Sequence, residues 1–226
     1  MLTRAAPIEP VGRRNPERTR KPGRLPHLAE IYTGGLDIEA RRRKYRIDLE
    51  TPRFLLRPLA AGDEDWLTDL FTDPEVNRFL WDQPETPEEA RRTAEAIVQL
   101  DLMRGHFGHW AILDKTSGEV HGWTELSKLR PWWGPSDEIA LSYVLGRASW
   151  GRGIATEAAG RLLRHAFEGA RLDRVMAVIM AGNTASKHVL EKLGMRFVKN
   201  AKSAGGQQLQ YFRIDAPPVA QPTAPE

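Results

Sequence analysis

Residues 141–157 read LSYVLGRASWGRGIATE. The apolar run from Ile139 to Leu145 predicts a β-strand, which ends at Gly146. Beyond the glycines, apolar residues recur at spacings of three and four, which predicts a helix with one buried face. These residues are Ala155, Ala158, Ala159, Leu162, Leu163, Ala166 and Phe167. Gly151 and Gly153 are therefore expected on a strand-to-helix turn.

Such a turn directs successive backbone N–H groups into one concavity, and the following helix adds the positive end of its dipole. The turn centred on 150–155 is therefore a candidate site for phosphate oxygens. A Walker turn does not fit, because no Lys-Ser/Thr pair follows Gly153. A Rossmann turn does not fit either, because Thr156 stands at the third glycine position and the next apolar strand, 175–180, ends without an acidic residue. A bare turn before a helix remains the alternative interpretation.

Length and composition predict one domain with tails. The 226 residues match the usual size of a single domain. No apolar window approaches the roughly 18 residues of a membrane span, and no signal peptide pattern is present, so we expect a cytoplasmic protein without membrane contact. The chain has no cysteine, which excludes disulfides, thiolate metal sites and a cysteine nucleophile. Its six histidines lack HxxxH or HExxH spacing, so we expect no metal.

The basic character of the chain is concentrated at its start. Residues 1–50 hold 12 Lys/Arg against 7 Asp/Glu, which leaves 21 against 23 in the remainder. Residues 1–50 are expected to be a largely disordered leader with a possible short helix, and residues 216–226 a disordered tail. The run from Arg41 to Lys44 could contact RNA or another acidic partner, although a solvated charged face is the other interpretation.

The domain is expected to start at Thr51 and to end at Asp215. Its other predicted elements are an edge strand over 53–59, a helix from Asp63 to Phe71, a helix from Thr86 to about Leu102, a hairpin of 109–113 and 120–126, a strand over 175–180, a helix from Asn183 to Gly194, and two final strands over 195–198 and 209–214. Asp63 and Asn183 are the expected N-caps, and Thr86 with Glu89 the expected capping box. The strands 139–145 and 175–180 flank a helix, so they are expected to pair in parallel.

Two motifs in the second half of the chain resemble those of one family. Trp150 to Ala158 reads WGRGIATEA, with Gly153 and Ala155 at the small positions of the Q/R-x-x-G-x-G/A loop and Trp150 in place of its Gln or Arg. Asn183 to Met195 matches N-x-x-S-x-x-V-L-x-K-L-G-M/F throughout. From Thr51 to Asp215 the chain resembles the GNAT acyl-CoA N-acyltransferases, and its WGxGxATEA run resembles the RimJ/RimL-like branch.

The resemblance implies an α+β, three-layer fold with a mixed, mostly antiparallel twisted sheet, a splayed parallel strand pair and helices on both faces. It also implies acetyl-CoA as the acyl donor. The pantetheine arm would pair with the strand edge at Tyr143, Val144 and Leu145, where the parallel strands separate. The remaining residues implied for this ligand are Trp150, Gly151, Arg152, Gly153, Ile154, Ala155 and Thr156 in the turn, and Asn183 and Ser186 beyond it.

The chemistry implied is direct attack of a neutral amine on the thioester within a ternary complex, because no cysteine can carry the acyl group. A backbone N–H of the central strand would stabilise the oxyanion. Glu138 is the first candidate for the general base and Glu125 the second, with water as a third possibility. The family commonly has a glutamate at the position that Ala140 occupies here, and Glu138 lies two residues earlier on the same side of the strand. Alternatively, Glu138 is a solvated carboxylate at a strand start.

The family tyrosine that protonates the thiolate corresponds to Leu190 here. By resemblance Ser186 is the donor in this branch; its hydroxyl could instead serve only the third position of a helix. The aromatic residues Trp81, Trp132 and Trp133 either line the acceptor site or pack against the core.

The resemblance leaves the acceptor open between a protein N-terminus and a small-molecule amine, and the assembly between monomer and homodimer. Two other functions remain alternatives: a non-catalytic acyl-CoA-binding regulator, and a nucleic-acid or ribosome-binding role for the leader.

Overall fold

The computed structural model describes residues 47–80, 83–101, 107–129, 137–203 and 205–218. The predictions for the leader up to residue 46, for Trp81, for the Trp132-Trp133 loop and for the end of the tail lie outside these ranges. None of the helices within the described ranges is long and apolar enough to cross a membrane.

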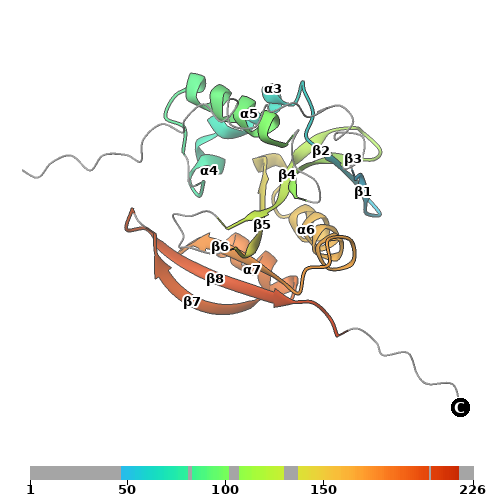
Figure 1. Ribbon diagram of the computed structural model, residues 1–226. Helices are drawn as coiled ribbons and strands as arrows, with labels where there is room; N and C mark the ends of the chain where they lie inside the picture. The colour runs from blue at the N-terminus through green and yellow to red at the C-terminus, as the bar shows by residue number, and fades with distance from the viewer. Residues whose placement is uncertain (1–46, 81–82, 102–106, 130–136, 204, 219–226) are drawn as a thin grey trace, which may run out of the picture. The chain divides into compact units, whose positions relative to one another are not determined.

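One sheet of eight strands organises the described chain, in the order β1-β2-β3-β4-β5-β6-β8-β7 (Figure 1). The strands are β1 (Leu49–Glu50), β2 (Phe54–Pro58), β3 (Gly108–Asp114), β4 (Val120–Lys128), β5 (Ile139–Leu145), β6 (Arg174–Met180), β7 (Arg196–Lys202) and β8 (Gln208–Asp215). All neighbours are antiparallel except β5 and β6, which are parallel as predicted. The mixed α+β fold expected from the sequence is confirmed.

The parallel pair separates almost at once. β5 and β6 are paired in register only at Ala140 and Met176, near the beginning of both strands. From Leu141 to Tyr143 the edge of β5 that faces β6 is not covered by strand pairing, so its backbone groups are available to another extended chain, whereas the Leu145 carbonyl already accepts from Trp150 Nε1 (2.8 Å).

Helices cover both faces of the sheet. They are α3 (Glu64–Thr72), α4 (Pro74–Asn77) and α5 (Pro87–Asp101) on one face, and α6 (Ile154–Arg164) and α7 (Thr184–Lys192) on the other. Alternate residues of β3 show the two layers: Ala111 packs with the α3–α5 cluster, whereas Trp110 and Ile112 pack with the α6 cluster. Figure 1 shows α3, α4 and α5 grouped together, away from α6 and α7.

The N-cap predictions are confirmed for Thr86 and Asn183 and wrong for Asp63, and the capping box is changed because Glu89 bonds the residue before the N-cap. The Thr86 hydroxyl accepts from the Glu89 N–H (3.1 Å), while the Glu89 carboxylate reaches back to the Glu85 N–H (2.8 Å). Asn183 Oδ1 accepts from the Ser186 N–H at the start of α7. Asp63 precedes α3 but does not cap it, because its carboxylate accepts instead from Arg57 and Trp66.

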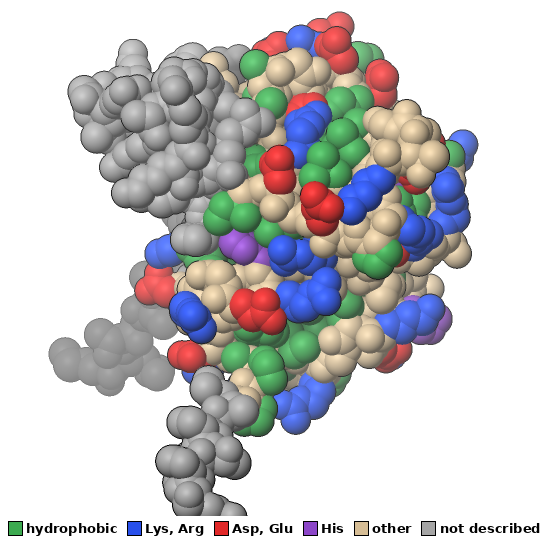
Figure 2. Space-filling view, turned by 90° about the vertical axis from the view of Figure 1, so that its right-hand side faces the viewer, with side chains coloured by type: hydrophobic (Ala, Val, Ile, Leu, Met, Phe, Trp, Pro, Cys, Tyr) green, Lys and Arg blue, Asp and Glu red, His purple; other side chains and the backbone are tan. Residues whose placement is uncertain are grey.

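The beginning of the sheet differs from the prediction, and the order of its last strands was not predicted. We expected the strand over 53–59 to be an edge strand, but β1 pairs with the outer side of β2. Burial of Leu49, which is 2% exposed, favours this pairing. The last strand in sequence, β8, inserts between β6 and β7, which leaves β7 at the edge. On the face shown in Figure 2, Lys and Arg side chains are interspersed with Asp and Glu.

Candidate functional site

The glycine turn after β5 has the backbone conformation of an anion site. Gly151 (φ 72°) and Gly153 (φ 75°) are both in the left-handed region, where a residue with a Cβ is strained. Ile154 begins α6 directly after the second glycine. The first N–H groups of a helix have no partner within the helix, so the turn presents them together with the positive end of the α6 dipole. The strand-to-helix turn predicted from the sequence is therefore present, and phosphate binding at this turn stays a prediction.

A contact missed by the sequence analysis holds this turn in place. Glu157, in the first turn of α6, accepts from the Arg53 backbone N–H (3.1 Å) and from Arg53 Nε (2.7 Å). Arg53 Nη1 also donates to the carbonyl of Arg152 (3.2 Å). Burial raises the pKa of Glu157, but hydrogen bonds from Thr51 and Arg53 outweigh it and lower the pKa. We call this set of contacts the Arg53–Glu157 latch.

Weakening the latch is expected to loosen the turn without unfolding the domain. In Glu157→Gln, Arg53 is no longer held by a charged partner, so its hydrogen bond to the Arg152 carbonyl in the turn weakens. The dissociation constant for acetyl-CoA should therefore rise three- to tenfold. The domain should stay folded, because an exposed ion pair contributes only about 0–1 kcal/mol to folding. Isothermal titration with acetyl-CoA measures this change. Asp215→Asn removes the charge from the surface ion pairs with Arg196 and Arg213 and should leave binding unchanged; equal affinities in both variants would contradict the role of the latch.

A cavity of about 400 Å³ lies over the turn, and we call it the loop cavity. Eleven of the residues expected to bind the donor line it: Tyr143, Val144, Leu145, Trp150, Gly151, Gly153, Ile154, Ala155, Thr156, Asn183 and Ser186. Arg152, the twelfth, is not among the lining residues, since its side chain turns back toward the Ala148 carbonyl. His188 and Lys192 of α7 also line the loop cavity and were not predicted.

A second cavity of about 140 Å³, the sheet cavity, lies on the other side of the β5 edge. Its walls come from β3, β4, β5, β6, the helices α3, α5 and α7, and the segment after α4. Both cavities share the lining residues Phe79, Leu80, Tyr143, Val144, Asn183 and Ser186. The two cavities therefore meet at the point where β5 and β6 separate.

Three polar side chains form a row across the floor of the sheet cavity. His109 of β3 pairs with Glu125 of β4, and Glu125 pairs with Ser142 of β5, so all three lie on the same face of the sheet. His109 and Glu125 are 4% and 3% exposed. His109 Nε2 lies 3.5 Å from Glu125 Oε1. A carboxylate is thus held inside this cavity, at the position of our second candidate base.

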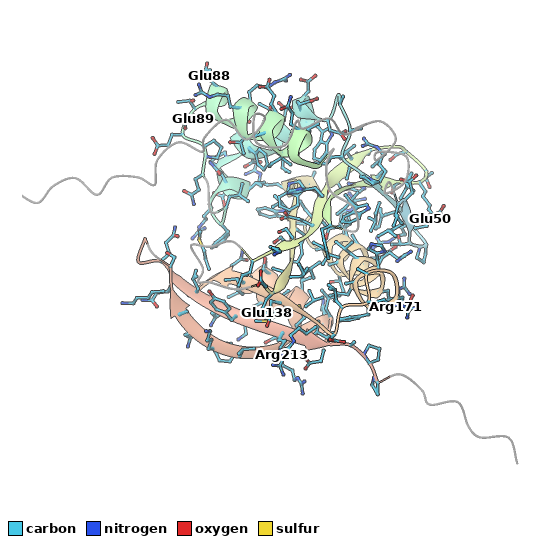
Figure 3. All side chains as sticks on the ribbon, viewed as in Figure 1. Glu50, Glu88, Glu89, Glu138, Arg171 and Arg213 are labelled. Carbon is cyan, nitrogen blue, oxygen red and sulfur yellow. The ribbon has the colours of Figure 1, made fainter. Side chains whose placement is uncertain are left out.

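The first candidate base lies elsewhere. Glu138 precedes β5 and forms an ion pair with Arg174 at 3.8 Å, at the end of the strands opposite the glycine turn. Figure 3 shows it beside the beginning of β5, and it is not among the residues lining either cavity. Ser142 is four residue steps further along the chain, roughly 13 Å in a strand. The structure thus brings Glu125, and not Glu138, to the other predicted site residues.

Tyr143 and Ser186 stand at the junction of the two cavities. The Tyr143 hydroxyl donates to the Ser186 carbonyl at 3.2 Å. Burial raises the pKa of Tyr143 to about 12, with a small opposing effect of the hydrogen bond to Ser186. The phenol therefore stays protonated near neutral pH and remains a hydrogen-bond donor.

This buried phenol predicts a loss of stability in alkaline solution. Because the folded-state pKa is above the unfolded value of 10.0, its contribution is fully present below pH 10 and is lost as pH rises toward 12. The free energy of unfolding of the wild type should fall by roughly 1–3 kcal/mol more than that of Tyr143→Phe between pH 9 and 12. Urea denaturation at several pH values measures the difference. Parallel curves for the two proteins would contradict the prediction.

A glycine turn at the end of one parallel strand, an open strand edge beside it and two joined cavities are the features that the resemblance to acyl-CoA-dependent transferases implies. The comparison with known families agrees: the family model "Acetyltransferase (GNAT) domain" matches residues 53–196. The chain belongs to the GNAT acetyltransferase family. Members of this family use acetyl-CoA as acyl donor, and the protein is accordingly an acyltransferase.

Individual relatives are similar over most of the domain. The protein named "Uncharacterized N-acetyltransferase p20" of Bacillus licheniformis is 31% identical over 168 residues, 73% of this chain and 92% of the relative. "FsC-acetyl coenzyme A-N(2)-transacetylase" of Aspergillus fumigatus is 28% identical over 156 residues, 67% of this chain and 66% of the relative. A solved GNAT-family acetyltransferase from Bordetella pertussis has a TM-score of 0.62 at 26% identity and covers 74% of this chain and 99% of its own.

Proposed function

We propose that this protein transfers the acetyl group of acetyl-CoA directly to a primary amine while both substrates are bound. The observation that carries this proposal is the junction of the two cavities at Tyr143 and Ser186. One cavity is lined by the glycine turn around Gly151 and Gly153, and the other is lined by Glu125. Donor and acceptor can therefore approach each other from opposite sides of the β5 edge.

Two parts of the chain would hold the donor. The N–H groups of the turn around Gly151 and Gly153 would bind its diphosphate, because a helix start with two left-handed glycines favours anions. The open edge of β5 would pair with the extended pantetheine arm, as a peptide pairs with a sheet edge. Lys192, at the rim of the loop cavity, adds a positive charge for a further phosphate.

Three groups of the chain would serve the reaction. Glu125 would take a proton from the acceptor amine, which has to be neutral to attack. A backbone N–H on the open edge of β5 would donate to the carbonyl oxygen as negative charge develops there, an effect worth roughly 3–4 kcal/mol for a preorganised donor. The hydroxyl of Ser186, at the junction, would donate to the departing thiolate.

The acceptor is proposed only as a class. A primary amine fits the sheet cavity because Glu125 attracts an ammonium group, while Phe71, Ile97 and Trp123 contact the apolar part of the molecule. A protein N-terminus and a small-molecule amine both present such a group. The run WGRGIATEA supports a place in the RimJ/RimL-like branch.

Binding and turnover can be tested separately. Acetyl-CoA should raise the melting temperature of the purified protein in a saturable manner. The same protein should release free CoA thiol when acetyl-CoA is combined with members of an amine panel of peptides, polyamines, amino acids and aminoglycosides. Absence of saturable binding would refute the proposal, and binding without thiol release for any amine would favour the non-catalytic regulator instead.

A further inference from the structure

The sheet cavity contains a second buried ionisable group that the proposed reaction does not use. His109 lies beside Glu125 on the neighbouring strand, with Nε2 and Oε1 3.5 Å apart. Both side chains are at least 95% buried. A buried charge is costly unless a partner of opposite charge lies close by. A charge on either group is therefore expected to be stabilised by the other group, and because both are shielded from solvent, a proton is expected to pass between them more readily than to water.

The geometry of the pair is set by rigid elements. The ring of His109 packs edge-on against Trp123, with ring centroids 4.8 Å apart. His109 lies in β3 and Trp123 in β4, and each of these strands is paired with a neighbouring strand on either side. Ser142 continues the row toward the β5 edge, where the acyl group would be delivered. The pair therefore lies on the acceptor side of the junction, in a fixed orientation.

Few other described groups near the pair can take up a proton near neutral pH. From β2 and the start of α3, Arg57 and Asp63 face the same side of the sheet, but they are bound to each other at 2.7 Å. From α5, Thr93 and Ile97 line the cavity, and the charged side chains of Glu88, Glu89, Arg91, Arg92 and Glu95 are exposed. From β5, Tyr143 stays protonated. The other residues that line this cavity carry no ionisable side chain: Phe71, Phe79, Leu80, Trp123, Leu141, Ser142, Val144, Ala177–Met180, Asn183, Ser186 and Leu190.

We propose that Glu125 and His109 accept the acceptor's proton as one unit, with His109 as the positioning residue that shares it. The inference rests on the proposed function. In this proposal the unit carries one net negative charge before the amine binds. The bound ammonium passes one proton to this unit, which becomes net neutral, and the neutral amine then attacks the thioester. The second proton leaves the nitrogen as the C–S bond breaks and ends on the CoA thiolate, and the unit returns its proton to water after product release.

A shared proton predicts a coupled titration. When two ionisable groups interact strongly, their protons come off in steps that belong to the pair. We expect the Glu125 carboxyl carbon and the His109 ring nitrogens of the wild type to respond in NMR at the same pH. In Glu125→Gln, the His109 titration midpoint should fall by at least one pH unit, a tenfold change in proton affinity. His165, on the other face of the sheet against Trp110, is the control in the same sample and should not move.

Kinetics provide the second measurement, with the best amine of the panel as acceptor. The rise of kcat/KM with pH should move by at least one unit to lower pH in His109→Gln, because carboxylates in general lose their proton at lower pH than imidazoles. The KM for acetyl-CoA should stay the same. His165→Gln makes the same chemical change at another buried site and should leave the pH profile in place.

The outcomes separate this inference from the function on which it rests. Coupled titrations together with a shifted pH profile support the pair. Independent titrations in the wild type, or an unshifted profile in a folded and active His109→Gln, would overturn the pair while the acetyltransferase proposal stands. Failure of the wild type to acetylate any amine would instead remove the proposed function, and the role of His109 with it.

Discussion

Gly153→Val is expected to abolish acetyl-CoA binding while the domain still folds. Gly153 has φ of 75°, and a Cβ there would only touch Arg53 at 3.6 Å, so the side chain itself can be accommodated. A residue with a Cβ in the left-handed region costs about 1–2 kcal/mol, and a branched side chain costs more. Valine would distort the turn and cover the N–H groups that bind phosphate. We expect at least a hundredfold increase in the dissociation constant, measured by isothermal titration.

The matched control is Gly118→Val. Gly118 lies in the turn between β3 and β4 with φ of 74°, and nothing lies within 4 Å of the added Cβ. This variant reproduces the backbone strain at a site remote from the loop cavity. Both variants should lose similar stability in urea, but only Gly153→Val should lose acetyl-CoA binding. If both variants bind acetyl-CoA normally, or both fail to bind it, the phosphates of acetyl-CoA do not bind at the turn around Gly153.

Glu125→Gln is expected to lower kcat by a factor of about 10² to 10⁴ with little change in the KM for acetyl-CoA. Glutamine keeps the size and polarity of the buried side chain but cannot accept a proton, and general base catalysis contributes a factor of this size. Steady-state rates of thiol release with saturating acetyl-CoA provide the measurement. The melting temperature of the variant checks that the loss is not unfolding.

Glu138→Gln tests the competing assignment with the same chemical change. Glu138 pairs with Arg174 outside both cavities, so this variant should retain nearly full activity. A larger loss of kcat in Glu138→Gln than in Glu125→Gln would reverse the assignment of the base. Equal, small losses in both would leave water as the proton acceptor and would contradict the role of Glu125.

Local elements were predictable because their signals are local. The helical spacing of apolar residues after Gly153 and the apolar run of β5 depend on residues a few positions apart. The N-cap at Asn183 and the glycine turn depend on even shorter patterns. The same reasoning failed for Asp63, because Arg57 and Trp66 compete for its carboxylate in the folded chain.

The choice between Glu138 and Glu125 shows the limit of strand periodicity. A period of two places Glu138 and Ser142 on the same face of β5, but it does not say how far along the strand the reaction occurs. The position is set where β5 and β6 separate, after Ala140 and Met176. That separation depends on strands far apart in the sequence.

The pairing of His109 with Glu125 depends on a single extra residue. Leu113 pairs with Val120, whereas Ile112 pairs with Gly122, so His121 is an additional residue on β4. Without this bulge, the same hairpin would place His109 opposite Thr124. Gly122 permits the close packing here, because a Cβ at this position would lie 2.1 Å from the Val144 carbonyl oxygen.

The sequence by itself determined most of the elements, though not β1 or α4, together with the parallel pair around α6, the glycine turn and the family to which these belong. All of these depend on patterns within a few tens of residues. Only the tertiary structure decided the insertion of β8 between β6 and β7, the Arg53–Glu157 latch across 104 residues, and the carboxylate that enters the sheet cavity. These features depend on strand register and on long-range packing, since side chains distant in the chain compete for the same neighbours only after the sheet has formed.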